Sequence, residues 1–277
     1  MTDFDYQWKN LMEVESLENE EKKIPMFHDF EYNNDRVKEF LKLTGIKSWY
    51  SKDFAIGKYR FDIDIKSLYK KDSFIKNKIC LDAGCGSARM LRLLSEKHNA
   101  NFIGIDLSSS LYDAASIKSI NLIRGDLLKL PFKDNYFDFI FSGGVLHHTG
   151  NPQRAFKNLV KSLKPKGKIY IWLYSVEQGI FGKVRKFLPG IYKISNPVLY
   201  YLCWLFAFPI YLGGILFSKF HSFSEIRFKL FDHLSPKYRS VHTENEVIHW
   251  FKENNLINIE VIISQVTGGV GILGEKA

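Results

Sequence analysis

Three aspartates that each stand beside a short apolar run are the residues whose types and spacing could do chemistry. Asp82 opens the turn 82–88 (Asp-Ala-Gly-Cys-Gly-Ser-Ala), and Asp106 and Asp126 follow the next two apolar runs. Glycines in such a turn let the backbone approach a ligand and present amide groups at a helix start. A carboxylate at this point repels a pyrophosphate and attracts a cation. Because Arg89 stands where a dinucleotide fingerprint has its third glycine, the pattern favours a positively charged cofactor over a nicotinamide dinucleotide.

Short apolar runs alternate with segments of helical spacing in the middle of the chain, and this alternation predicts the elements that position the aspartates. We expect five strands, at Lys78–Ala83, Asn101–Asp106, Asn121–Arg124, Tyr136–Ser142 and Lys168–Tyr174. We expect helices at Ser87–His98, Ser108–Lys118 and Asn151–Lys164, and a turn at Lys164–Gly167. Repeated strand–helix units indicate a parallel sheet, in which the ends of successive strands form one ligand-binding edge.

The alternation breaks after residue 174, which divides the chain into four parts. These are a helical, aromatic N-terminal extension (1–77), a cofactor-binding core (78–174), an apolar, basic-flanked cap insertion (175–242), and a C-terminal helix and hairpin that complete the core (243–277). Thr243 and Glu246 predict a capping box for a helix that runs to about Asn254. Strands near 257–264 and 268–275, joined by a turn at 265–267, predict an antiparallel hairpin. The expected fold class is α/β, with a Rossmann-like, seven-stranded, mostly parallel sheet.

The glycine turn resembles motif I of class I S-adenosylmethionine-dependent methyltransferases, acid-x-Gly-x-Gly-x-Gly, with Ala88 at the third glycine. The blocks 130–148 and 163–167 also resemble this family, in particular its type 11 members, so the likeness covers about 78–174. It implies that S-adenosylmethionine is the cofactor. The turn would wrap its methionine portion with Asp82 at the amino group, while Asp106 would accept the ribose hydroxyls and Asp126 the adenine amino group. The implied cofactor-binding residues are Asp82, Ala83, Gly84, Cys85, Gly86, Asp106, Leu107, Asp126, Leu127 and Gly143.

Two adjacent histidines, His147 and His148, follow the fourth expected strand. The resemblance places this pair beside the cofactor, and we expect one of them to line the cleft. His147 is the candidate general base, because histidine suits proton transfer near pH 7. Adjacent side chains rarely aim at one site and no third ligand is near in sequence, so we expect no metal site. Tyr6, Trp8 and Tyr174 are further candidates for the acceptor side.

Charge and hydropathy are both uneven, and they bear on the methyl acceptor. The net charge is +9, and residues 151–242 hold 15 lysines and arginines against three acidic residues. Within them, segment 193–219 has no charge between its terminal lysines. Three interpretations stay open: the wall of an apolar acceptor pocket, a membrane-interface contact, or the core of a helical cap or dimer contact.

The membrane interpretation predicts particular contacts. Aromatic side chains would lie at headgroup depth and basic side chains on lipid phosphates, namely Tyr200, Tyr201, Trp204 and Tyr211, and Lys183, Arg185, Lys186, Lys219, Arg227 and Lys229. Because strands of one sheet precede and follow the segment, we expect it not to cross a bilayer. We also expect Pro209 and Gly213–Gly214 to break a straight helix.

These features predict methyl transfer from S-adenosylmethionine to a small-molecule acceptor that is hydrophobic or lipid-linked. One alternative is a non-catalytic module that keeps the fold and docks on a membrane or partner. Another is an RNA methyltransferase, but Ser142–Val145 stands where an Asn-Pro-Pro-Tyr-type motif would follow strand four, so a nucleic-acid partner is not expected. Three scattered cysteines and the absence of a signal-peptide pattern predict a cytoplasmic location, peripheral at the membrane if 193–219 contacts lipid. The oligomeric state, the acceptor and the methylated atom stay open.

Overall fold

The computed structural model of the chain describes most residues after Phe74. The described residues are 75–86, 88, 91, 95, 100–109, 111, 120–175, 185–216, 223–263 and 269–277. The predicted N-terminal extension with Tyr6 and Trp8, most of the two helices predicted after the first and second strands, and the turn predicted at 265–267 lie outside them.

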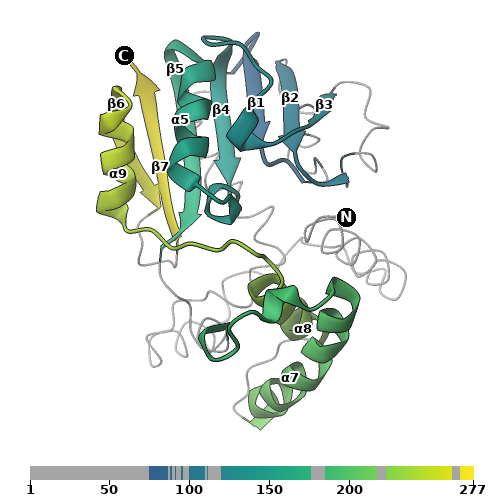
Figure 1. The fold of residues 1–277 in the computed structure, drawn as a ribbon. Helices are drawn as coiled ribbons and strands as arrows, with labels where there is room; N and C mark the ends of the chain where they lie inside the picture. Colours follow the sequence, from purple (N-terminus) through teal and green to yellow (C-terminus); the bar gives the residue numbers. More distant parts are fainter. Residues whose placement is uncertain are drawn as a thin grey trace, which may run out of the picture.

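A seven-stranded sheet forms the body of the protein (Figure 1), and its order is β3-β2-β1-β4-β5-β7-β6. The strands are β1 (Ile79–Ala83), β2 (Asn101–Asp106), β3 (Ile120–Arg124), β4 (Phe137–Gly143), β5 (Leu163–Tyr174), β6 (Leu256–Ile263) and β7 (Gly269–Lys276). The first five pair in parallel, whereas β7 lies antiparallel between β5 and β6. The predicted fold class and the C-terminal hairpin are therefore confirmed, and the strand bounds are close to those expected except at the start of β5.

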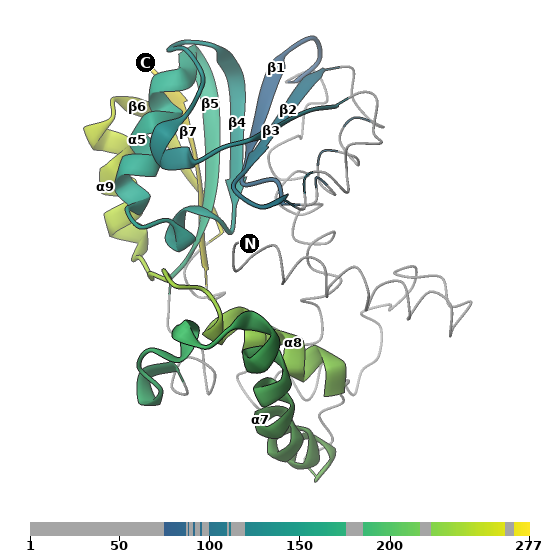
Figure 2. The same cartoon turned by 45° about the vertical axis from the view of Figure 1, so that its right-hand side comes forward.

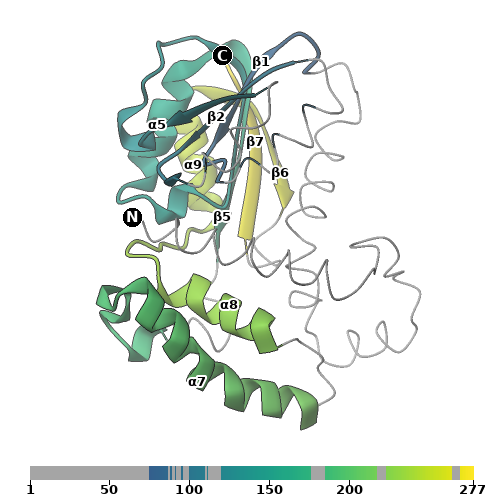
Figure 3. The same cartoon turned by 90° about the vertical axis from the view of Figure 1, so that its right-hand side faces the viewer.

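Two helices, α5 (Pro152–Ser162) and α9 (Glu244–Glu253), cover one face of the sheet (Figures 2 and 3). Their buried side chains, among them Phe156 and Phe251, enter one core cluster with β1, β2, β4, β5 and β7. The Asn151 side chain caps α5 by accepting the Arg154 N–H, and proline occupies the first turn as predicted.

The capping box predicted for α9 is present in only one direction. Thr243 Oγ1 accepts the Glu246 N–H at 3.2 Å, which confirms the N-cap. The Glu246 carboxylate, however, contacts His242 Nδ1 at 2.8 Å. His242, immediately before the N-cap, offers the Glu246 carboxylate a ring nitrogen as its hydrogen-bond partner. This contact joins α9 to the segment that precedes it.

The turn predicted at Lys164–Gly167 lies inside strand β5. Leu163 already pairs with Phe137, and pairing resumes at Lys168 opposite Phe139. The residues between them bulge out of the ladder, with Lys166 in the left-handed region at φ 60°. The change of chain direction at these residues was thus correctly predicted. Because strand pairing continues on both sides, however, it is a bulge within β5 and not a turn that separates α5 from the strand.

A helical cap lies beyond the carboxyl ends of the parallel strands (Figure 1). It contains the short helix η4 (Ile191–Lys193) and two longer helices, α7 (Asn196–Leu216) and α8 (Phe223–Leu234). Helix α7 is unbroken through Pro209 and Gly213–Gly214, so the predicted interruption is wrong. A proline costs a helix about 3 kcal/mol, and packing of the apolar face of α7 on α8 offsets that cost.

Helix α7 has a buried face and an exposed face, and both are apolar. The buried side chains pack against α8: Leu199, Tyr200, Cys203 and Ala207 on α7, with Ile226, Leu230, Phe231 and Leu234 on α8. The exposed side chains are Val198, Tyr201, Trp204, Leu205, Phe206, Phe208 and Leu212. Within the described part of the chain, no helix is long and apolar enough to cross a membrane.

Three of the side chains predicted to meet lipid headgroups point elsewhere. Tyr200 is buried against α8, and Arg227 stacks on its ring with Nη2 2.7 Å from the phenol oxygen. Arg185 donates to main-chain carbonyls, including those of His233 and Pro236. Both guanidinium groups are partly buried, so they need hydrogen-bond acceptors within the protein. Because they find these acceptors in the cap, their contacts stabilise the cap.

At the end of the sheet opposite the cap, Asp138 joins two parallel strands. Its Oδ2 atom accepts the Ile79 N–H at 2.9 Å and contacts Lys164 Nζ at 3.0 Å. Burial acts to raise the pKa of this carboxyl, but the Ile79 N–H and Lys164 outweigh it, so the pKa lies below its usual range. The ionised carboxylate therefore stabilises the fold above pH 4, and this contribution is lost as the pH falls through the lowered pKa.

We expect Asp138→Ala to lower the free energy of unfolding by about 1–3 kcal/mol at pH 7, since the partly buried Ile79 N–H loses its charged acceptor. Urea denaturation followed by tryptophan fluorescence measures this change. Glu260→Gln, on the outer strand β6, is the matched control and should leave stability within about 0.5 kcal/mol. Equal losses in both variants would show that Asp138 does not join the strands.

Candidate functional site

The turn after β1 approaches the end of β4 very closely. Gly84 has φ 91°, a conformation that side chains disfavour, and a Cβ on it would overlap the Val145 side chain. Ser142 Oγ donates to the Ala83 carbonyl at 2.8 Å, which fixes the two strand ends together. The strand order reverses between β1 and β4, and folds of this kind hold their ligands in the crevice at such a point.

Asp106, at the end of β2, organises the same turn. Its Oδ2 accepts the Gly86 N–H at 2.8 Å and its Oδ1 accepts the Ser108 N–H at 2.8 Å. The Gly84 N–H donates to the Ile105 carbonyl at 2.7 Å. The predicted juxtaposition of the glycine turn and the second aspartate is therefore present in the structure.

The pKa of Asp82 is strongly perturbed. It is 5 % exposed at the end of β1, and burial, reinforced by the nearby Asp106 charge, raises its pKa to about 8. The same burial and the two aspartates raise the pKa of Cys85, so this thiol stays protonated. A buried carboxyl beside a second carboxylate suits a cationic ligand, whose charge would repay the cost of ionisation.

The remaining predicted cofactor residues surround this centre in different ways. Asp126 Oδ1 accepts the Leu128 N–H at 2.8 Å and caps the short helix η2 (Leu127–Lys129). Leu127 is buried in the core, so its visible role is packing, and its contact with adenine stays a prediction. Leu107 is 51 % exposed at the end of β2, and Gly143 is exposed at the end of β4.

The two histidines lie in the short helix η3 (Leu146–His148) and differ in their contacts. His147 is fully buried, stacks near Tyr174 with ring centroids 4.0 Å apart, and accepts the Tyr174 N–H at Nδ1 over 3.3 Å. This contact occupies one basic nitrogen and does not favour proton abstraction by His147. His148 Nδ1 contacts the Tyr238 carbonyl at 3.1 Å. Burial and the charges of Arg239 and Arg185 lower the pKa of His148 to about 4, so it is neutral at pH 7.

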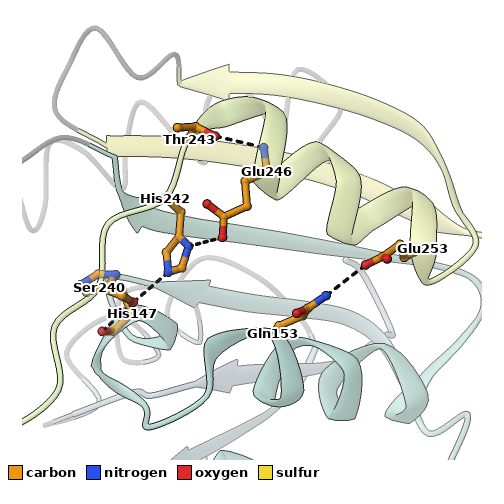
Figure 4. A network of polar contacts seen from close by, with 7 residues as sticks. All are labelled: His147, Gln153, Ser240, His242, Thr243, Glu246 and Glu253. Atoms are coloured by element: carbon orange, nitrogen blue, oxygen red, sulfur yellow. Dashed lines mark hydrogen bonds and ion pairs between the residues drawn. The ribbon is translucent and has the colours of Figure 1, made fainter.

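A polar latch, made by Ser240, His242 and Glu246, joins the cap-to-core linker to the histidine segment (Figure 4). His242 Nδ1 lies 2.8 Å from Glu246 and its Nε2 lies 2.8 Å from Ser240 Oγ. The Ser240 N–H donates to the His147 carbonyl at 3.0 Å, and the His242 N–H to the Tyr174 carbonyl at 2.9 Å. Sequence reasoning missed this latch. The only signal for it in the sequence is the spacing of Ser240, His242 and Glu246.

No metal centre accompanies these residues. Among the described residues, no group of three or more His, Cys, Asp or Glu side chains is arranged to hold a metal ion.

Comparison with known proteins agrees with this geometry. Residues 81–171 match the family model described as a methyltransferase domain. A tRNA (carboxymethyluridine(34)-5-O)-methyltransferase of Arabidopsis thaliana is 31% identical over 43% of this chain and 29% of its own length. A demethylmenaquinone methyltransferase of a Geobacillus strain is 25% identical over 69% of this chain and 76% of its own. Residues 81–171 of the chain are therefore similar to a methyltransferase domain.

The fold itself is shared with solved structures. A chain from the complex between the Haloferax volcanii Trm112 methyltransferase activator and "the putative methyltransferase" superposes with a TM-score of 0.53 at 14% identity, over 86% of this chain and 96% of that one. The tRNA methyltransferase relatives are much longer proteins, since the chain spans only 27% to 29% of their length. The glycine turn and the three aspartates lie within residues 81–171, the part that matches the family model.

The raised pKa of Asp82 predicts how stability depends on pH. The folded state favours the protonated carboxyl, so its stabilising contribution is complete below pH 4 and is lost as the pH rises towards about 8. We therefore expect Asp82→Asn to gain stability relative to the wild type as the pH is raised from 5 to 9. Urea unfolding at these two pH values measures the difference.

Asp106→Asn provides the matched comparison, since the Asp106 charge contributes to the raised pKa of Asp82. It should reduce the pH dependence without removing it. A constant offset between wild type and Asp82→Asn at both pH values would contradict the raised pKa.

Proposed function

We propose that the protein transfers a methyl group from S-adenosylmethionine to a hydrophobic or lipid-linked small molecule. The observation that carries the enzymatic part is the buried Asp82 carboxyl beside the glycine turn, with Asp106 bonded to that turn. The observation that supports an apolar acceptor is the exposed apolar face of α7 in the cap.

The chain's own residues fit the cofactor. When bound, S-adenosylmethionine supplies an electrophilic methyl group on a positively charged sulfur. Asp82 would ionise to receive the ammonium group of its methionine portion, and Gly84 would allow the backbone to approach it. Asp106 would accept the ribose hydroxyls, and Asp126 the adenine amino group. These roles follow from the family resemblance and from the position of each carboxylate at a strand end.

Positioning of the acceptor can supply much of the rate enhancement, because the reacting carbon is already activated. A base is needed only if the acceptor atom carries a proton at the moment of attack. The contacts of His147 argue against proton removal by that residue, so an acceptor that is already unprotonated, or that loses its proton to solvent, fits the site better.

We further propose that segment 193–219 contacts a membrane surface and that the protein is cytoplasmic and peripheral there. Tyr201, Trp204 and Leu205 are 70 %, 49 % and 63 % exposed on α7. Exposed lysines precede the helix at positions 186 and 193. An apolar helix face with flanking cations is the composition of an interfacial helix, which binds by burying its apolar side chains below the anionic headgroups.

A second candidate is methylation of RNA, supported by the tRNA methyltransferase relatives and by the basic residues of 151–242. It predicts that transfer RNA binds with an affinity that falls steeply with salt. Methyl incorporation into RNA rather than into lipid extracts would decide for this candidate.

The cofactor site is tested by calorimetric titration with S-adenosylmethionine. We expect micromolar binding, weakened by about 1–3 kcal/mol in Asp106→Ala, which is the usual cost of deleting a charged hydrogen-bond partner. Leu212→Ala, on the cap, is a control that should bind as the wild type does. No binding by the folded wild type would refute the enzyme and favour a non-catalytic docking module.

Membrane contact is tested by co-sedimentation with vesicles of phosphatidylcholine and phosphatidylglycerol. We expect Trp204→Glu with Leu205→Glu to reduce binding at least tenfold, because two apolar side chains no longer enter the interface. Ile257→Glu places the same change on an exposed side chain of β6 and should bind normally. Equal binding by all three proteins would contradict a contact through α7.

A further inference from the structure

Two arginines meet the segment that leads from the cap back to the core: Arg185 Nη2 donates to the Pro236 carbonyl at 2.7 Å, and Arg239 stands three residues further along the chain. Arg239 stacks on Tyr174, with its Cζ 4.6 Å from the ring centroid. Burial lowers the pKa of Arg185, and the positive charge of Arg239 lowers it further. The charges of both arginines also lower the pKa of His148. Like charges held together in a partly buried place are destabilising unless an anion joins them.

The protein supplies no anion to this pair within its described part. No described carboxylate lies within ion-pair distance of Arg185 or Arg239. Two acidic groups of the cap and latch have other partners, since Asp232 contacts His233 and Glu246 contacts His242.

The two arginines also differ in what they already bind. Arg185 is committed to the fold, because its Nη atoms donate to the carbonyls of His233, Leu234 and Pro236. Arg239 has a buried Nη2 with no acceptor among the described residues, although its side chain as a whole is partly exposed. A buried donor without an acceptor is costly, so Arg239 has both the unused hydrogen-bonding capacity and the access to solvent that a ligand needs.

The position of this pair relates it to the methyl-transfer site. The Tyr174 ring contacts both Arg239 and His147. His147 follows Val145, the residue that lies against Gly84 in the cofactor turn. Arg239 is thus linked to the cofactor turn through Tyr174 and the short helix η3.

The latch makes this placement rigid. Arg239 immediately precedes Ser240, whose main-chain N–H and hydroxyl both contact the His147 carbonyl, at 3.0 and 3.3 Å. Tyr238, on its other side, is held through its carbonyl by His148. A side chain fixed on both sides is suited to recognition, because little conformational freedom is lost on binding.

We infer that Arg239, with Arg185 behind it, binds an anionic group of the methyl acceptor, a phosphate or a carboxylate. Guanidinium groups suit both anions, since paired N–H donors match two of their oxygens. This inference rests on the proposed function and deepens it: the acceptor is amphipathic, with an anionic group at the Tyr174–Arg239 stack and its apolar part towards the cap.

The experiment measures thermal stability with inorganic phosphate or acetate as probes, at constant ionic strength set with potassium chloride. We expect a saturable rise in Tm for the wild type with at least one probe, and the probe that acts distinguishes phosphate from carboxylate recognition. Arg239→Gln should lose the rise and Arg239→Lys should keep part of it. Lys237→Gln removes the same charge from an exposed neighbour and should retain the full effect.

A second readout follows the His148 ring by NMR. Anion binding should raise the pKa of His148 in the wild type, because it offsets the charges that lower it, and this change should be absent in Arg239→Gln. No rise in Tm and no change at His148, or equal responses in Lys237→Gln and Arg239→Gln, would overturn the inference. Binding of S-adenosylhomocysteine to Arg239→Gln, measured by calorimetry, separates this failure from failure of the proposed function, which Arg239 does not carry.

Discussion

The close approach of the β1 turn to the end of β4 is the constraint on which the site depends. Gly84 leaves no room for a side chain beside Val145, and Ser142 bonds the Ala83 carbonyl across the same gap. This approach brings η3 over the crevice, and with it the histidine pair on which Tyr174 packs. A larger residue at position 84 would push η3 away, so the cofactor turn and the acceptor side are mechanically one unit.

Charge is divided across that unit. Asp82 and Asp106 make one side acidic and suited to a cationic cofactor, while Arg185 and Arg239 make the cap side cationic. Burial and the Asp106 charge oppose ionisation of Asp82, and the two arginines are partly buried cations, so charging either pair fully costs stability in the free protein. Each cost is recovered only when a ligand of opposite charge is bound. This arrangement therefore lowers the stability of the free protein. In exchange, it allows two ligands of opposite charge to bind at fixed places.

The sequence predicted what depends on short-range pattern and missed what depends on distant contacts. Strand–helix alternation and the glycine turn were sufficient for the sheet, its hairpin and the meeting of Asp82 with Asp106. Pro209 was expected to end α7, but burial of the apolar inner face against α8 outweighs the local proline penalty. Tyr200 and Arg227 were expected to contact lipid headgroups because of their residue types and their place beside an apolar segment. In the structure they bond to each other inside the cap. The latch could not be predicted, because its partners on β5 and η3 are close to Ser240 only in the folded chain.

The latch also explains how an insertion between two strands of one sheet can serve the site. The cap leaves the core after β5 and returns through Ser240 and His242, which bond to η3 and to the end of β5. Both points of attachment are therefore at the carboxyl edge where the crevice opens, and neither is on the far side of the sheet. His242 in turn contacts Glu246 at the start of α9. At the other end of α9, Glu253 accepts a hydrogen bond from Gln153 on α5. A residue carried on this linker, such as Arg239, keeps a fixed relation to the core even if the outer part of α7 is free to engage a surface.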